Sequence, residues 1–119
     1  MTKTNTIEDQ PLVSVIMNCY NGEKYMQEAI ESVYAQKYKN WEIIFWDNAS
    51  TDGSAQIANA YNSKFKYFLG EKTIPLGAAR NKALEQCSGE YIAFLDCDDL
   101  WLPDKLLMQI PLFENNKIG

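Results

Sequence analysis

Four short apolar runs, each rich in β-branched or aromatic residues, alternate along this chain with segments of helical periodicity. The runs span residues 12–17, 42–46, 64–69 and 91–95. The segments that follow them are 24–36, 54–61, 78–87 and the stretch from Pro103 onward. In these segments apolar residues recur three and four positions apart. Nearly continuous apolar strands are typical of sheets covered on both faces. The β-α-β-α-β-α-β-α order therefore predicts an α/β fold, with a Rossmann-like, mostly parallel sheet and helices on both faces.

A single domain accounts for most of the 119 residues. Residues 1–10 are polar and are expected to form a flexible leader, and residues 11–119 to form the domain. The leader lacks the apolar core of a signal peptide. No apolar run approaches the roughly 20 residues that span a membrane. Pro111 is expected to kink or end the last helix.

The composition excludes several classes of site. The chain has no histidine, which removes histidine-based acid–base catalysis and histidine metal ligands. Its formal net charge is −5 and it has no arginine-rich segment, so a nucleic-acid partner is not expected. Cys19, Cys87 and Cys97 lack CxxC spacing and are expected to be free thiols in a reducing compartment.

Three carboxylates crowd the end of the fourth run, in YIAFLDCDDLW, at Asp96, Asp98 and Asp99. Carboxylates this close resist ionising together unless a positive group joins them. They supply hard oxygen ligands, for which Mn²⁺ or Mg²⁺ is the natural partner. One aspartate could instead cap the following helix. Three aspartates beside a buried strand favour metal binding over helix capping.

Polar clusters also follow the first two runs, at residues 18–21 and 47–54. In a parallel sheet these clusters and the acidic one lie at the same edge, where ligands bind near the point of strand-order reversal. Asp47 comes first beyond its strand and is expected to face that crevice. A carboxylate or carboxamide there can accept a hydrogen bond from a base or a sugar hydroxyl. The 47–54 loop can instead lead into a helix that its residues cap, and both interpretations stay open.

Two further side chains are candidates. Tyr20 can pack in the core or stack on a flat ring bound in the crevice. Arg80 is the only arginine and is expected near the start of the 78–87 helix. It can form a surface ion pair, usually worth little, or bind phosphate oxygens. A neighbouring metal–phosphate site favours phosphate binding by Arg80 over a surface ion pair. The three tryptophans are expected to pack in the core, with Trp101 as the candidate exception.

The stretches VSVIMNCYN, IIFWDNASTDGS, GAARNKAL and SGEYIAFLDCDDLWLPDKL, in this order, resemble the N-terminal half of family 2 glycosyltransferases, which have the GT-A fold. The resemblance covers nearly the whole chain from Pro11 onward. It implies an inverting transfer of a sugar from a nucleoside diphosphate sugar, with a UDP-sugar expected, to a carbohydrate or lipid-linked acceptor. It also implies dependence on Mn²⁺ or Mg²⁺.

The resemblance assigns roles to individual residues. By the family pattern, Asn18 and Tyr20 line the nucleoside pocket, and Asp47 and Asn48 face the base. Arg80 lies near the base or phosphates, and Asp96 contacts the ribose or sugar. Asp98 holds the cation, with Asp99 beside it. The general base is expected beyond residue 119, in an acceptor half. A cytoplasmic location is implied, with any contact to the inner face of the membrane made through that region.

One departure from the family bears on the base. Many members have two consecutive acids and then glycine-serine after the second strand, whereas this chain has Asp47-Asn48-Ala49-Ser50. A non-catalytic nucleotide-sugar binding module is the alternative function. A phospho-acceptor switch domain ranks last, because it requires an acidic pair after the first strand and a lysine after a fifth.

Overall fold

A computed structural model describes residues 11–110. Seven elements follow one another, strands and helices alternating as predicted: β1 (Val13–Cys19), α1 (Met26–Tyr34), β2 (Trp41–Asp47), α2 (Ser54–Ala58), β3 (Phe65–Leu69), α3 (Leu76–Leu84) and β4 (Tyr91–Phe94). A further helical segment covers residues 105–110. The predicted leader and Pro111 lie outside the described residues.

The four strands form one parallel sheet in the order β3-β2-β1-β4. The register aligns Val13 of β1 with Trp41 of β2 and with Tyr91 of β4. Successive strands step outward from β1 to β3, and the chain then crosses back to place β4 on the other side of β1. The strand order thus reverses between β1 and β4, which confirms the predicted parallel α/β sheet and locates its switch point.

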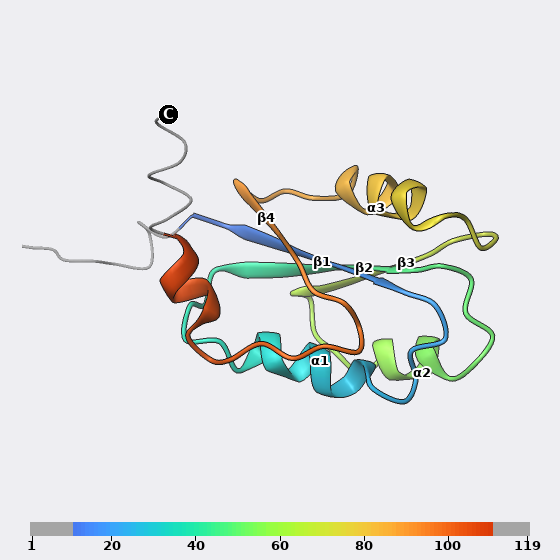
Figure 1. Ribbon diagram of the computed structural model, residues 1–119, viewed down its shortest axis with the longest axis horizontal. Coiled ribbons are helices and arrows are strands. Elements are labelled where there is room, and N and C mark those ends of the chain that lie inside the picture. The colour runs from blue at the N-terminus through green and yellow to red at the C-terminus, as the bar shows by residue number, and fades with distance from the viewer. Residues whose placement is uncertain (1–10, 111–119) are drawn as a thin grey trace, which may run out of the picture.

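Helices cover both faces of the sheet (Figure 1). The larger core lies under α1 and α2, where Met26, Ile30 and Val33 of α1 pack on the alternate residues of β1 and β2. The other face carries a smaller core of Ile16, Ile44 and Ala83 under α3. Because α3 buries only two alanines, most of its surface remains exposed. The prediction of helices on both faces is confirmed, with unequal coverage.

Element boundaries shift by a few residues from the predicted ones. The most consequential shift is in α3, which begins at Leu76 directly after Pro75 instead of at residue 78. Pro75 has φ −59° and ψ 153°, an extended backbone that precedes the first helical turn. Arg80 therefore lies in the second turn of α3, not near its start.

The segment after β4 is attached to the end of α1 through Gln36, which is fully buried. Gln36 Nε2 donates to the carbonyl of Leu102 at 2.6 Å, and its Oε1 accepts from the Leu106 N–H at 3.0 Å. Pro103 lies in the turn that precedes the 105–110 helix, close to its predicted place. These bonds anchor both ends of the segment that follows the acidic cluster.

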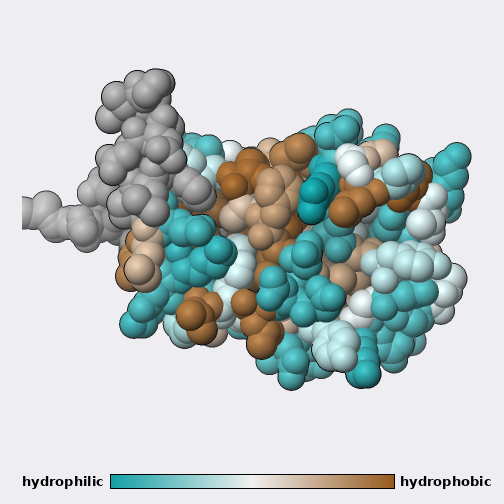
Figure 2. Space-filling view, viewed as in Figure 1, coloured by the Kyte–Doolittle hydropathy of each residue, from teal (hydrophilic) through white to brown (hydrophobic). Residues whose placement is uncertain are grey.

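Among residues 11–110, no helix is long and apolar enough to cross a membrane. Figure 2 shows hydrophobic residues interspersed with hydrophilic ones across the face in view. Trp41 is buried in the larger core and Trp46 packs against the smaller one, as predicted. Trp101, the candidate exception, is buried in the larger core as well.

Candidate functional site

A hollow of about 420 Å³ lies at the switch point, beyond the carboxyl ends of β1 and β4. This is where ligands bind in open parallel sheets. Four residues predicted for the site line it: Asn18, Tyr20, Asp96 and Asp98. The hollow is also lined by Asn21, which belongs to the polar cluster expected at this edge. Four further lining residues have no binding role predicted from the sequence: Gly22, Tyr25, Leu76 and Cys97.

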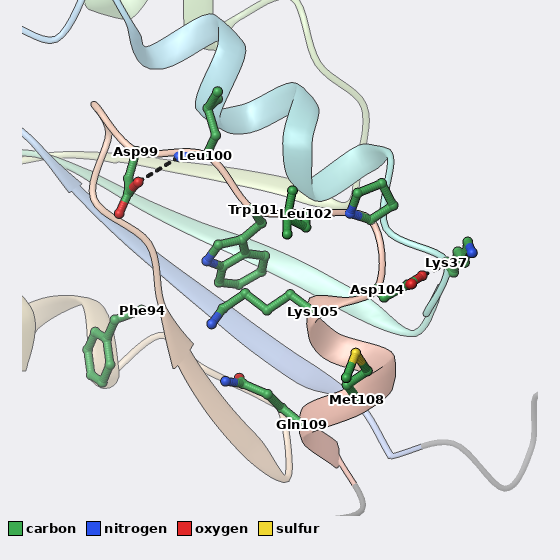
Figure 3. A pocket seen from close by; sticks show the side chains of 11 residues that line it. Lys37, Phe94, Asp99, Leu100, Trp101, Leu102, Asp104, Lys105, Met108 and Gln109 are labelled. Atoms are coloured by element: carbon green, nitrogen blue, oxygen red, sulfur yellow. Dashed lines mark hydrogen bonds and ion pairs between the residues drawn. The ribbon is translucent and has the colours of Figure 1, made fainter.

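The acidic cluster divides between two cavities. Asp96 and Asp98 are exposed and line the hollow. Asp99 lines a separate groove of about 870 Å³ along the segment after β4, and its Oδ1 accepts from the Leu100 N–H at 2.9 Å. Figure 3 shows this groove, with Asp99 at one end and Lys105 beside Trp101. The carboxylates gathered at the hollow are therefore Asp96 and Asp98.

Asn18 and Tyr20 offer unused binding capacity to the hollow. Asn18 Nδ2 is buried and has no hydrogen-bond partner in the described structure. A buried donor without an acceptor costs free energy, so an acceptor supplied by a ligand would satisfy it. Tyr20 is 53% exposed, although its neighbour Cys19 belongs to the core. Its ring is free to pack against a bound group, and it does not fill the core.

The rim of the hollow is held by bonds between the loops that follow β1 and β2. Asn21 has φ 53°, and its Oδ1 accepts from the Thr51 N–H at 2.7 Å, while its own N–H donates to Ser50 Oγ at 2.8 Å. Asp52 accepts from the backbone N–H of Ser54 at 3.0 Å and so helps to start α2. For much of the 48–54 loop the structure thus shows a structural role.

Asp47 does not line the hollow. It is fully buried, and both carboxylate oxygens already accept hydrogen bonds. The Tyr67 hydroxyl donates to Oδ2 at 2.5 Å and the Ser50 N–H to Oδ1 at 2.8 Å. Burial together with this bond to a carboxylate raises the pKa of Tyr67, which keeps the phenol protonated. The family resemblance implies that Asp47 contacts the base of the nucleotide. That contact would have to compete with these two hydrogen bonds.

The Asn48 side chain is likewise engaged within the protein. Its Nδ2 donates to the carbonyl of Ile74 at 2.8 Å, and its Oδ1 accepts from the Ile74 N–H at 3.0 Å. The Thr73 hydroxyl donates to the Asn48 carbonyl at 3.0 Å. A carboxamide suits this paired contact because it offers one donor and one acceptor. Asn48 thereby positions the loop that leads to Leu76, at the wall of the hollow.

Arg80 lies on the exposed surface of α3, outside the residues that line the hollow. Its guanidinium stacks over the ring of Phe94, with the Cζ atom 5.4 Å from the ring centroid. Phe94 ends β4, two residues before Asp96. Among residues 11–110 no carboxylate forms an ion pair with Arg80, so the guanidinium stays available beside the acidic edge.

The residues at the hollow fit a hard divalent cation. Among the described residues no group of three or more Asp, Glu, Cys or His side chains could enclose a metal ion by itself. Mg²⁺ is commonly held by one or two carboxylates, with waters and substrate phosphates completing its shell. Asp96 and Asp98 supply two carboxylates on an open hollow. This donor set suits a cation that arrives with a diphosphate.

Sequence comparisons identify the family. The model of "Glycosyl transferase family 2" matches residues 14–119. The UDP-Glc:alpha-D-GlcNAc-diphosphoundecaprenol beta-1,3-glucosyltransferase WfgD of Escherichia coli is 40% identical over 112 residues, which cover 93% of this chain and 44% of the relative. This chain therefore spans less than half the length of that relative.

Solved structures share the fold. TarS 1-349 of S. aureus, in complex with UDP-GlcNAc, has a TM-score of 0.80 and 32% identity, covering 87% of this chain and 31% of the other. The mannosyltransferase PcManGT of Pyrobaculum calidifontis, in complex with GDP-Man and Mn²⁺, has a TM-score of 0.77 and 27% identity, covering 84% and 31%. Together with the parallel sheet, these likenesses confirm the predicted N-terminal part of a GT-A fold. This chain belongs to glycosyl transferase family 2.

Proposed function

We propose that this chain binds a nucleoside diphosphate sugar, with Mn²⁺ or Mg²⁺, in the hollow between β1 and β4, and that it is the donor-binding part of an inverting glycosyltransferase. The observation that carries the proposal is the meeting of Asp96, Asp98, Asn18 and Tyr20 at the switch point of the sheet. UDP is the expected nucleotide. Family membership supports the reaction class.

Each of these four residues has a role that its chemistry permits. Tyr20 stacks on the base, and the unpaired Asn18 Nδ2 donates to an acceptor atom of the nucleoside. Asp98 would hold the cation, with Asp96 beside it contacting the ribose or the sugar. When bound, the cation neutralises the diphosphate and stabilises the departing nucleotide as a Lewis acid.

Arg80 adds a second positive group at the same edge. Its guanidinium lies over the ring of Phe94, two residues before Asp96, and so at the edge where a diphosphate would be held at Asp98. A guanidinium matches phosphate oxygens through two parallel hydrogen bonds. In this arrangement Arg80 binds the leaving group, while the base that activates the acceptor hydroxyl is not assigned to any of residues 11–110.

The acceptor and the location are part of the same proposal. The name of the E. coli relative specifies a diphosphoundecaprenol-linked sugar as the acceptor of that enzyme, which supports a lipid-linked carbohydrate acceptor here. We propose that transfer takes place on the cytoplasmic side, at the inner face of the membrane.

A thermal-shift screen tests the donor site. UDP, GDP and TDP are each added with Mn²⁺ or with EDTA. A ligand at 100 times its Kd stabilises the folded state by about 2.7 kcal/mol, so a clear rise in Tm is expected for UDP with Mn²⁺. We expect a smaller rise for GDP and TDP, and little with EDTA. No shift with any nucleotide in the presence of Mn²⁺ would contradict the proposal.

Turnover separates an enzyme from a binding module. A UDP-sugar incubated with the chain and Mn²⁺ is followed by chromatography of free UDP. Transfer, or slow hydrolysis, releases UDP, whereas a non-catalytic module would bind the UDP-sugar and return it unchanged. The same assay on Asp98→Asn protein controls for release by contaminating enzymes.

A further inference from the structure

Two of the three cysteines meet beneath the hollow. Cys19 ends β1, and Cys97 lies between the two carboxylates that line the site. The β1–β4 register pairs Ile16 with Phe94. The Leu95 N–H also donates to the Ile16 carbonyl at 3.0 Å, so the chain runs beside β1 as it enters the turn that holds Cys97.

The surroundings of Gly22 show how close the two sulfurs come. A Cβ atom built on Gly22 would lie 2.4 Å from Cys19 Sγ and 3.0 Å from Cys97 Sγ. Both sulfurs therefore flank one point, which only a hydrogen atom can occupy. The two thiols are thus placed to form a bond through a local movement of residue 97.

The third cysteine provides an internal comparison. Cys87 lies on the other face of the sheet, where it packs against the small core under α3. Its Sγ donates to the carbonyl of Ala83 at 3.5 Å. Cys97 is partly buried and packs instead against the larger core, which includes Cys19 at 2% exposed. Only Cys97 reaches the hollow, so small oxidants arriving there meet its sulfur first.

We propose that Cys19 and Cys97 form an oxidisable dithiol and that a disulfide between them inactivates the donor site. With hydrogen peroxide as oxidant, the Cys97 sulfur attacks one peroxide oxygen, the O–O bond breaks, and a sulfenic acid and one water form. The Cys19 sulfur then displaces the second water as the S–S bond forms. Two thiols lose two electrons and two protons in total, and the peroxide is reduced to two waters. A thiol reductant reverses the reaction.

The bond would act on the site through the backbone of residue 97. An S–S bond is about 2.05 Å long, much shorter than the contact of two thiols, so it draws residue 97 toward β1. Asp96 and Asp98 flank that residue and must turn with it. This consequence rests on the proposed function, because it concerns the carboxylates assigned to the cation and the sugar. The formation of the disulfide is independent of the proposed function.

Peptide mapping of the full chain tests the dithiol itself. After peroxide treatment, the number of free thiols is expected to fall from three to one, with the Cys19 and Cys97 peptides linked and Cys87 still open to alkylation. Cys87→Ser protein should form the same link, and Cys97→Ser protein should not. A link that includes Cys87, or no link at all, would overturn the assignment.

Nucleotide titrations of reduced and oxidised protein test the effect on the site. We expect oxidation to weaken binding of UDP with Mn²⁺ by at least about tenfold, as disturbance of metal-ligand geometry commonly does, with recovery after dithiothreitol. Equal affinity in the two states would overturn the effect. If neither state binds any nucleotide, the proposed function fails, and the peptide map alone still decides whether the dithiol forms.

Discussion

Asp98 and Asp99 are adjacent in the chain, yet they line different cavities. Asp98 borders the hollow at the switch point, whereas Asp99 borders the groove beside Trp101 and binds the N–H of Leu100. The tight turn closed by the bond from the Asp99 N–H to the Asp96 carbonyl, at 3.1 Å, separates the two side chains. The assignment of the cation to Asp98 and Asp99 together therefore needs a direct test.

Asp98→Asn should abolish most of the Mn²⁺-dependent affinity for UDP while leaving the fold intact. Residues that only hydrogen-bond to a metal's ligands are worth about 10–100-fold in metal affinity, so loss of a ligand itself should cost on the order of 100-fold or more. Asp99→Asn is the matched control, since it removes the same charge from the next residue. Exposed charges are worth little, and we expect its affinity to stay within about fivefold of the wild type. Isothermal titration calorimetry with UDP and Mn²⁺ measures the affinity of both variants. Equal losses of affinity would mean that Asp99 also binds the cation.

Arg80→Ala should weaken binding of UDP by about tenfold to 100-fold, because a hydrogen bond to a charged group contributes about 1.5–3 kcal/mol. Binding of uridine should change little, since it lacks the diphosphate. Lys82→Ala is the control on the same helix: Lys82 lines a different cavity, with Trp46 and Ile74. If UDP and uridine lose affinity equally, Arg80 does not contact phosphate.

Asn48→Ala should destabilise the chain by about 1–3 kcal/mol, because it leaves the N–H and the carbonyl of Ile74 without their partner. Asn48→Asp keeps the acceptor for the N–H but loses the donor to the carbonyl, so it should also destabilise. Urea denaturation measures both. Gln56→Ala, an exposed change on α2, should stay within about 0.5 kcal/mol. An Asn48→Asp protein as stable as the wild type would mean that the side chain is not held by Ile74.

Periodicity and β-branched content predicted the order of the elements and the parallel sheet, because both follow from which residues must be buried. The acidic cluster was predictable as a site for the same reason: Asp96 and Asp98 directly follow a strand whose other residues are apolar. Nothing local in the sequence distinguishes Asp98 from Asp99, however. Their separation depends on the turn after β4 and on the bonds that tie the following segment to Gln36.

The burial of Asp47 could not be predicted from its own neighbourhood either. A polar residue just beyond a strand is expected to face the crevice, but Tyr67 of β3 supplies a hydroxyl from twenty residues away. The two glycines at 70 and 77 predict a loop up to residue 77, whereas α3 begins at Leu76, directly after the extended backbone of Pro75. For Asp47 the deciding partner is distant in sequence and adjacent only in the folded sheet, whereas the start of α3 follows from the backbone of Pro75 directly before it.

A buried polar cluster at the opposite end of the sheet makes stability depend on pH. Glu42 is 4% exposed and accepts bonds from Ser14 Oγ at 2.6 Å, from the Ser88 N–H at 2.8 Å and from Lys66 Nζ at 2.8 Å. Burial alone would raise the pKa of Glu42, but the bonds from Lys66, Ser14 and Ser88 outweigh it and lower that pKa below the usual 4.5. The folded state therefore favours the ionised carboxylate.

Glu42→Gln should consequently lower the free energy of unfolding by about 1–3 kcal/mol at pH 7, where the carboxylate is ionised in both states. A lowered pKa in the folded state contributes stability above pH 4.5, and this contribution disappears as the pH falls through the folded-state pKa. The difference between wild type and variant should therefore shrink below pH 4.5. Urea titrations measure this difference in the free energy of unfolding at a series of pH values, from pH 7 down to the lowest pH at which the protein folds. Glu85→Gln, which changes an exposed residue, is the control. A difference that stays constant across the acid range would show that the contribution of Glu42 comes from its packing and not from its charge.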